Sequence, residues 1–205
     1  STSVPNPNNE YGKAKIMAEN IIKSEEISHT ILRISGIYGY MGPEHLGLNK
    51  AITASLDNAL IPILKGKGSA KRNYIYVNDL ARVIRLCVEK KIQGTHLLGG
   101  SETISMRKML EAICDTILDN AQLSIEKGNE SKSVVVKTSA VFPNSQTFIQ
   151  TLNEMVINEA LKSIIPNILQ HIHYIKDISS ERKIMSHSMN VSGAGDKSLS
   201  GFNFT

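Results

Sequence analysis

The strongest constraint on the fold is an alternation of helix-like and strand-like segments through residues 11–118. The first segment, 11–24, has apolar residues at helical spacing, which predicts a helix with one buried stripe. That stripe comprises Ala14, Met17, Ala18, Ile21 and Ile22. Further helices are expected at 46–60, 80–91 and 106–118, and strands at 30–35, 61–64, 73–77 and 95–99. Such alternation indicates an α/β fold with parallel strand pairs.

Turn-forming and capping residues set the limits of several segments. Glycines and a proline between residues 36 and 43 predict a loop, and residues 65–69 predict a glycine-bearing turn. Asn78 and Asp79 are residue types that cap helices, so we expect them to open the third helix. Ser105 is expected to cap the fourth helix for the same reason.

The pattern weakens after residue 118. Residues 133–137 suggest a strand, and residues 147–165 predict a helix that ends before Pro166. One more helix is expected at 167–175, and no heptad repeat is recognised. We therefore expect the whole chain to have three parts: a first domain at 1–118, a helical substrate-region extension at 119–178 and a mobile tail at 179–205.

Composition excludes several classes of protein. Hydrophobic residues make up 41% of the 205 residues, as in soluble globular domains, and no apolar run is long enough to span a bilayer. The 23 basic residues are scattered, which argues against a nucleic-acid surface. Without a visible signal peptide, we expect a cytoplasmic protein with Cys87 and Cys114 as buried thiols. His171 and His173 would face apart on a helix, so no metal site is predicted.

One side-chain pair points to chemistry. Tyr11 and Lys15 are four residues apart on a predicted helix and therefore lie on the same face. A phenol is a poor base at neutral pH, and a neighbouring ammonium favours its phenolate form. Such a tyrosine can exchange a proton with a carbinol oxygen while a cofactor exchanges hydride at the carbon. The spacing alone is a weak pattern, which also occurs in ordinary surface pairs.

Four motifs in order strengthen that interpretation. They are VPNPNNEYGKAKIMAE, ILRISGIYG, KRNYIYVNDLARVI and GTHLLGGSETISMRKMLEAI. Together they resemble the extended short-chain dehydrogenase/reductase family, and more narrowly its NAD-dependent epimerase/dehydratase group that acts on nucleotide sugars. The resemblance covers roughly residues 4–118. It implies an α/β fold, namely the C-terminal part of a Rossmann-like doubly wound parallel sheet plus a smaller substrate-binding region.

The resemblance also implies roles at the cofactor. Tyr11 matches the catalytic acid/base of the family. Lys15 matches the lysine that binds the nicotinamide ribose and activates the tyrosine. Ile37 and Tyr38 match the loop that passes the nicotinamide, so both are expected to contact the cofactor, which would be NAD or NADP.

Two further residues are expected to contact the substrate. Arg72 matches an arginine that commonly binds the diphosphate of the nucleotide sugar, a role suited to a planar bidentate guanidinium. Gly36 stands where many nucleotide-sugar epimerases have asparagine. Asp79 matches an acid of the family motif and is interpreted mainly as a helix cap, and Glu19 is interpreted as structural.

The chain departs from the family at its beginning. No glycine-rich dinucleotide fingerprint precedes Tyr11, so we expect the chain to be the C-terminal part of a longer enzyme. The parent would be an NAD(P)-dependent epimerase, dehydratase or reductase of a nucleotide-activated sugar, a homodimer at full length, and the fragment alone inactive. The alternative is a truncated, non-catalytic module or pairing subunit without its own cofactor site.

Overall fold

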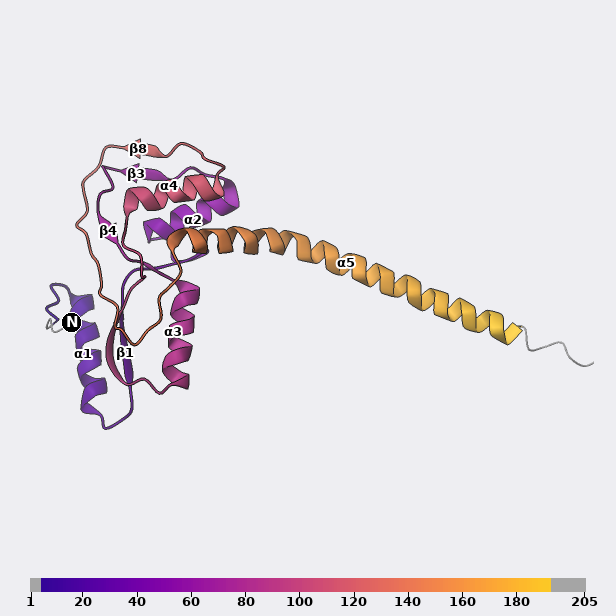
Figure 1. Cartoon of the computed structure of the whole chain (residues 1–205), viewed down its shortest axis with the longest axis horizontal. Helices are drawn as coiled ribbons and strands as arrows, with labels where there is room; N and C mark the ends of the chain where they lie inside the picture. Colours follow the sequence, from indigo (N-terminus) through magenta and orange to yellow (C-terminus); the bar gives the residue numbers. More distant parts are fainter. Residues whose placement is uncertain (1–4, 193–205) are drawn as a thin grey trace, which may run out of the picture. The chain divides into compact units, whose positions relative to one another are not determined.

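The computed structural model describes residues 5–192, and it describes side chains up to residue 180. The chain divides into two units, Ser1–Ile157 and Asn158–Thr205. The first unit contains all the strands and the first four helices of the described chain (Figure 1). It extends well beyond the boundary expected at residue 118.

Helices and short strands alternate through the first unit. The helices are α1 (Glu10–Ser24), α2 (Gly47–Asn58), α3 (Val77–Glu89) and α4 (Met106–Ile117), and α5 (Phe148–Ser192) begins in this unit. The strands are β1 (Thr30–Ile34), β2 (Ile37–Tyr38), β3 (Ile63–Lys65), β4 (Lys71–Arg72), β5 (Ile75–Tyr76), β6 (Gly94–Leu98), β7 (Ile104–Ser105) and β8 (Ser124–Glu126).

The strands form two-stranded pairs, and most of the pairs are parallel. β1 pairs with β6, β2 with β5 and β3 with β8, all in parallel, whereas β4 and β7 are antiparallel. The longest pair aligns Thr30 with Gly94 and Ile34 with Leu98. An α/β fold with parallel pairing is therefore confirmed. Four short strands, β2, β4, β7 and β8, lie where the sequence predicted no strand, and β2 falls within the loop predicted between residues 36 and 43.

Two apolar clusters form the core. The first packs α2 and α4 against the start of α5 and contains Tyr38, Leu48, Ile52, Leu64, Tyr76, Met109, Leu110, Ala112, Ile113, Phe148, Leu152 and Met155. The second packs α3 against β5 and β6 and contains Ile75, Leu80, Val83, Cys87, Leu98 and Phe142. Residues 142–155 thus complete the core that the α/β part begins. Both cysteines are buried and free, as expected.

The prediction that α1 has a buried apolar stripe is wrong. The helix forms as expected, but none of its residues is buried, and Met17 and Ile21 are 65% and 61% exposed. Among the described residues, α1 lies beside β1 at the edge of the unit (Figure 1), so its apolar side has little to pack against. The spacing predicted the helix correctly but could not identify its partner.

The predicted capping of α3 is also wrong. The helix begins at Val77 with Tyr76 at the N-cap position, so Asn78 and Asp79 lie inside its first turn. Both side chains make tertiary contacts instead. The Asn78 amide donates to Glu154 Oε1 at 2.8 Å, and the buried Asp79 carboxylate accepts from the Gln146 backbone N–H at 3.0 Å. By contrast, Ser105 caps α4 as predicted, since its hydroxyl accepts from Lys108 N at 3.3 Å.

Two differences concern the part after residue 118. Residues 133–137 form no strand, because only Val134 makes an isolated parallel bridge to Arg72. The helices expected on either side of Pro166 are one helix, α5, since a proline removes a single backbone donor and can bend a helix without ending it. Residues 179–192 continue α5, whereas residues 193–205 of the expected tail lie outside the described part of the chain.

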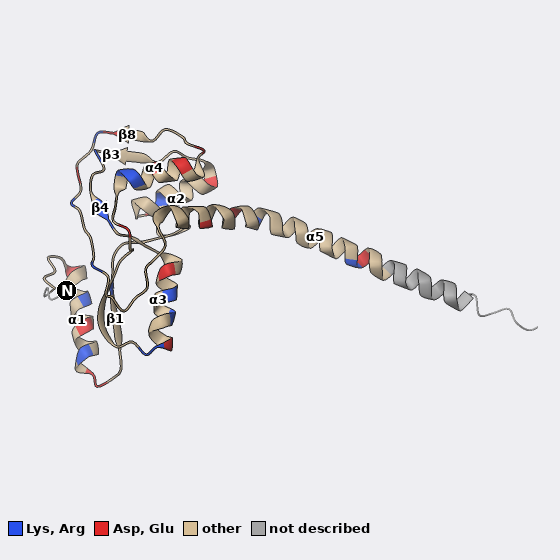
Figure 2. Ribbon diagram, in the orientation of Figure 1, with Lys and Arg blue, Asp and Glu red and all other residues tan. Residues whose placement is uncertain are grey.

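Charged residues are distributed as the sequence suggested. Basic and acidic residues are interspersed along α1, α3 and α4 (Figure 2). Several form ion pairs within one helix, such as Arg85 with Glu89 and Arg107 with Glu111. These exposed pairs each contribute only a few tenths of a kcal/mol, so they act mainly as a solvated surface.

Candidate functional site

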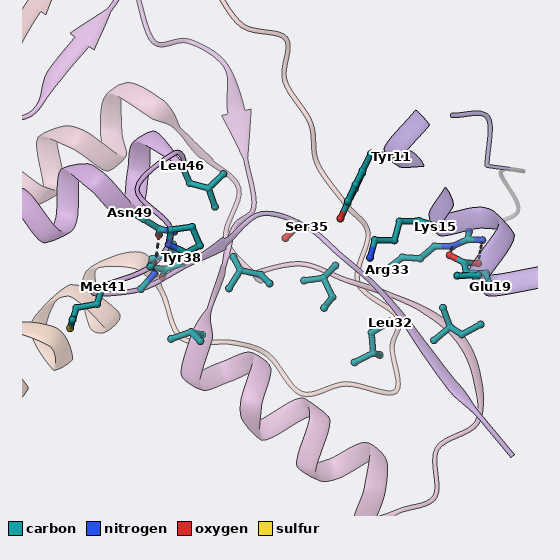
Figure 3. A pocket seen from close by; sticks show the side chains of 18 of the residues that line it. Tyr11, Lys15, Glu19, Leu32, Arg33, Ser35, Tyr38, Met41, Leu46 and Asn49 are labelled. Atoms are coloured by element: carbon teal, nitrogen blue, oxygen red, sulfur yellow. Dashed lines mark hydrogen bonds and ion pairs between the residues drawn. The ribbon is translucent and has the colours of Figure 1, made fainter. Parts of the chain in front are cut away.

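A cavity of about 830 Å³ lies between α1, β1, β2 and the loop that leads to α2. Its lining includes Tyr11 and Lys15 from α1, Ser35 from the end of β1, and Ile37 and Tyr38 from β2. Figure 3 shows these side chains around one space, with α1 on one side and the loop on the other. The volume is in the range of small-molecule and cofactor pockets.

Tyr11 and Lys15 lie side by side at this cavity. Asn9 caps α1 by accepting from Gly12 N at 2.8 Å, which places Tyr11 in the first turn and Lys15 one turn later. The Lys15 ammonium is 5.3 Å from the centre of the Tyr11 ring, a cation–π distance. The ring is 74% exposed, and its hydroxyl and the ammonium point into the same space (Figure 3). The phenol is therefore open to a substrate hydroxyl.

An ion pair fastens α1 to β1 beside this pair. Glu19 accepts two hydrogen bonds from Arg33, at 2.9 Å from Nε and 2.7 Å from Nη2, and a third at 3.3 Å from Lys23. The Arg33 hydrogen bonds hold the pKa of Glu19 below its usual range. A bidentate pair of this kind fixes orientation as well as distance. This contact agrees with the structural role expected for Glu19.

Tyr38 contributes to the cavity wall, but its hydroxyl is directed into the core. The hydroxyl is 2.6 Å from Thr151 Oγ1, and the ring packs 5.2 Å from that of Phe148 and 5.6 Å from that of Tyr76. Burial raises the pKa of Tyr38. Ile37 lies next to it in β2, paired with Ile75. The four residues expected at the cofactor thus line one cavity, with the Tyr38 phenol occupied elsewhere.

Gly36 is exposed and does not line the cavity, and the Tyr74 ring lies where a side chain at this position would be. A Cβ at this position would lie 1.8 Å from Tyr74 Cε1, so no side chain fits without moving the ring. The Gly36 carbonyl accepts from Ile75 N at 2.9 Å, which holds the backbone close to that ring. The asparagine that many nucleotide-sugar epimerases carry here would need a different placement of Tyr74.

Arg72 lies away from the cavity that holds Tyr11. It is in β4, and its Nη1 donates to the Lys71 carbonyl at 3.0 Å and to the Lys132 carbonyl. It lines a separate cavity of about 70 Å³ together with Glu130. The structure therefore brings together Tyr11, Lys15, Ile37 and Tyr38, and leaves Arg72 outside the group.

A polar network behind the cavity was not foreseen. Glu154 accepts from Asn78 at 2.8 Å, Gln146 Nε2 at 3.1 Å and the Tyr76 hydroxyl at 3.3 Å. Burial raises the pKa of Tyr76 to about 12, and the Glu154 charge adds to that effect. Burial would also raise the pKa of Glu154, but its hydrogen bonds outweigh burial and lower it. The residues of this network are far apart in sequence, and local spacing rules predict contacts only between residues that are close in sequence.

Two family models match adjacent parts of the chain. Residues 1–99 match the NAD dependent epimerase/dehydratase family. Residues 106–204 match the central region of the minor capsid protein P8. The first stretch contains α1 to β6 with the tyrosine and lysine, and the second begins at α4 and contains α5.

Individual relatives agree with the first match. A putative UDP-glucose 4-epimerase of Methanocaldococcus jannaschii is 28% identical over 134 residues, 62% of this chain and 43% of that protein. The methionine adenosyltransferase 2 subunit beta of Bos taurus is 30% identical over 119 residues, 55% of this chain and 35% of that protein. The chain thus spans less than half the length of these two relatives.

Solved structures share the fold. The UDP-glucuronic acid 4-epimerase of Bacillus cereus, in complex with NAD, superposes with a TM-score of 0.62 at 18% identity, covering 77% of this chain and 55% of that one. The dTDP-4-dehydrorhamnose reductase of Bacillus anthracis, in complex with NADP, gives 0.61 at 17% identity, covering 77% and 58%.

The fold and these matches define a class by its fold, the Rossmann-like α/β proteins. More particularly, residues 1–99 match the NAD dependent epimerase/dehydratase family, which confirms the resemblance drawn from the four motifs. No helix among the described residues is long and apolar enough to cross a bilayer. The same described part contains no group of three or more His, Cys, Asp or Glu side chains placed to hold a metal ion.

Proposed function

We propose that this chain is part of an NAD(P)-dependent epimerase, dehydratase or reductase that acts on a nucleotide-activated sugar. The observation that carries the proposal is the Tyr11–Lys15 pair at the mouth of the 830 Å³ cavity. A phenol and an ammonium side by side are suited to proton exchange with a sugar hydroxyl. Three of the proteins named above are by name a nucleotide-sugar epimerase or reductase: the putative UDP-glucose 4-epimerase, the UDP-glucuronic acid 4-epimerase and the dTDP-4-dehydrorhamnose reductase.

The residues present fit one end of a dinucleotide. Lys15 and Tyr11 offer an ammonium and a phenol to a ribose hydroxyl, and Ile37 gives an apolar wall for a nicotinamide ring. Within residues 5–192, no turn between a strand and a helix has the glycine spacing of a pyrophosphate-binding fingerprint. The chain therefore supplies the nicotinamide side of the proposed site.

When bound, the cofactor supplies hydride exchange at a sugar carbon. Tyr11 exchanges the proton of the hydroxyl on that carbon, acting as base in one direction and as acid in the other. The Lys15 ammonium, 5.3 Å from the ring centre, places a positive charge beside the phenol that carries out this exchange. The Glu19–Arg33 pair positions both by holding α1 against β1.

The test uses the full-length parent protein with UDP- and dTDP-sugars. Tyr11→Phe should lower kcat by roughly 10²- to 10⁴-fold, the usual contribution of a general acid–base group. Tyr174→Phe removes the same hydroxyl from an exposed ring on α5 and should leave kcat unchanged. Equal turnover of the Tyr11→Phe variant and the parent would sink the proposal.

A second candidate function concerns the second unit, and it corresponds to the pairing subunit considered as the alternative. We propose that α5 associates with further copies of this chain through one apolar stripe. Its members are exposed and recur at coiled-coil spacing: Leu161, Ile164, Ile165, Ile168, Ile172 and Ile175. The match of residues 106–204 to a capsid protein, a class that acts by assembly, favours this role.

Charge and area support copies of this chain as the occupant. In a heptad with Leu161, Ile168 and Ile175 at one core position and Ile165 and Ile172 at the other, Glu159 falls on the opposite face and Lys162 beside the stripe, and the two side chains pair at 2.6 Å. The stripe side chains are 42–63% exposed, so they present roughly 600 Å² per helix. Association of two helices would bury about 1,200 Å², the lower limit for a stable interface.

Light scattering after size exclusion tests the association. Ile168→Asp places a charge in the stripe and should convert the assembly to a monomer, because an unpaired charge in such an interface is strongly unfavourable. Leu169→Asp, one residue along and off the stripe, should leave the mass unchanged. A monomeric parent chain at 100 µM, or equal effects of the two variants, would refute self-association.

A further inference from the structure

The turn between β3 and β4 has a geometry that its sequence only partly explains. Residues 66–69 read Gly-Lys-Gly-Ser, and both glycines have positive φ, +77° at Gly66 and +64° at Gly68. Lys67, between them, has no positive φ, and a residue of this kind followed by one with positive φ can turn successive backbone N–H groups to the same side, which makes a concavity that binds anions. The turn therefore has the backbone of an anion site.

One carboxylate occupies that concavity. Glu130 Oε1 accepts from the backbone N–H groups of Lys67 and Gly68, the latter at 3.2 Å. Its Oε2 accepts from the Ser69 N–H at 3.3 Å and from the Ser69 hydroxyl at 2.8 Å. Four donors thus converge on a single charged group. These hydrogen bonds lower the pKa of Glu130, so it is ionised at neutral pH.

The turn is held by contacts on its other side. The Gly68 carbonyl accepts from Arg107 N at 3.0 Å, the Lys67 carbonyl from Arg107 Nε at 3.0 Å, and the Ala70 carbonyl from Met106 N at 3.0 Å. The start of α4 therefore fixes the peptide planes. We therefore expect the N–H groups to stay directed to the same point when Glu130 leaves.

Glu130 comes from a part of the fold without regular secondary structure. Its side chain is exposed, and it belongs to a stretch between β8 and the Val134 bridge that contains no helix or strand. A carboxylate that leaves such a position loses its four hydrogen bonds to the turn but regains full hydration, which offsets much of that loss. A stronger anion can therefore compete for the same donors.

The surroundings of the turn are basic. Lys65 and Arg72, on the two flanking strands, line the adjoining cavity of about 70 Å³ together with Glu130. Lys67 and Lys71 add two further cations within the same short stretch. A phosphoryl group carries more charge and more acceptor oxygens than a carboxylate, and it gains more from such a field.

We propose that the turn 66–69 is a binding site for a phosphoryl group, and that the Glu130 carboxylate fills it until such a group displaces it. The site is separate from the cavity of Tyr11, so the proposal does not depend on the reaction assigned to that cavity. The ligand chemistry is that of inorganic phosphate or of a nucleotide phosphate. Glu130 acts as a built-in competitor that lowers the apparent affinity.

Calorimetric titration of the full chain with inorganic phosphate, pyrophosphate and UDP tests this assignment. Glu130→Ala should tighten phosphate binding at least fivefold, because the competitor is removed. Glu126→Ala removes the same charge from the neighbouring strand β8 but leaves the turn filled, so it should change affinity less than twofold. Adding Ser69→Ala to Glu130→Ala should weaken binding again, because one donor is lost.

Amide spectra provide a second measurement if Glu130→Ala lowers stability. Glu130→Gln keeps the shape of the side chain, and phosphate should then shift the Gly68 and Ser69 amide resonances at lower concentration than in the parent. Tighter binding of UDP than of pyrophosphate assigns the site to nucleotides, whereas equal binding assigns it to free phosphate. Equal phosphate affinities of the Glu130→Ala and Glu126→Ala variants would show that Glu130 is only a structural tether and overturn the proposal.

Discussion

Thr151→Val is the most informative single change in the core. Thr151 is fully buried in the first turn of α5, where its hydroxyl lies 2.6 Å from the Tyr38 hydroxyl and donates to the Phe148 carbonyl at 2.7 Å. Valine has nearly the same shape, so the change removes polar contacts and leaves the packing of the apolar cluster intact. The Tyr38 phenol then remains buried without its partner.

The expected cost follows from that unpaired phenol. Leaving a buried hydroxyl unsatisfied costs about 1–3 kcal/mol, whereas removing both partners is nearly neutral. Thr151→Val should therefore lower the unfolding free energy by about 2 kcal/mol, and adding Tyr38→Phe should restore much of it. Urea unfolding of the parent, both single variants and the double variant gives the coupling energy. Additive effects would refute the reasoning, because they would mean that the start of α5 does not depend on β2.

Three further predictions concern other parts of the first unit. Gly36→Ala should cost about 1–3 kcal/mol in thermal unfolding, because its Cβ would meet the Tyr74 ring, and a neutral result would contradict the close approach. Glu19 has a lowered pKa in the folded state, so the stabilisation it gains from Arg33 is present above about pH 4.5 and is lost as the pH falls through the folded pKa. In acid titration, the Glu19→Gln variant should therefore lose less stability than the parent. Parallel stability curves of the two proteins would argue against the ion pair. Burial raises the pKa of the Cys114 thiol, so it should react with a thiol reagent only as fast as the protein unfolds, and immediate labelling would show that α4 is not packed as described.

Much of the fold could be predicted from local pattern. The alternation of segments located all four helices of the α/β part within a few residues, because helical spacing and turn residues act over short distances. Strand β8 was not predicted, because its three exposed residues show no alternation of apolar and polar side chains. Pro166 was wrongly predicted to end a helix, because α5 continues through it: a proline inside a long helix can bend the helix without ending it. Because the helix was expected to end at Pro166, the apolar stripe on α5 was also missed, since it is continuous only if the helix continues through Pro166.

The candidate site was predictable only where motif and local geometry coincide. Tyr11 and Lys15 share a helix, so their spacing placed them together without tertiary information. Arg72 was grouped with them through the family resemblance, whereas the fold directs its guanidinium to nearby carbonyl groups. The capping expected of Asp79 failed because a contact with Gln146, far along the chain, outweighs a local preference. Long-range partners of this kind leave no spacing in the sequence.

The helix that carries Tyr11 has no buried side chain, and this affects its dynamics. Local opening of a segment is opposed by the apolar surface that the segment covers, and α1 covers little. Its amide hydrogens should therefore exchange with solvent through fluctuations far smaller than global unfolding, while those of α4 should not. Because the Glu19–Arg33 pair is the main polar link of α1 to β1, added salt should accelerate that exchange selectively. If α1 opens so readily, the Tyr11 phenol would reach the geometry that the proposed reaction needs only once a ligand fills the cavity beside it.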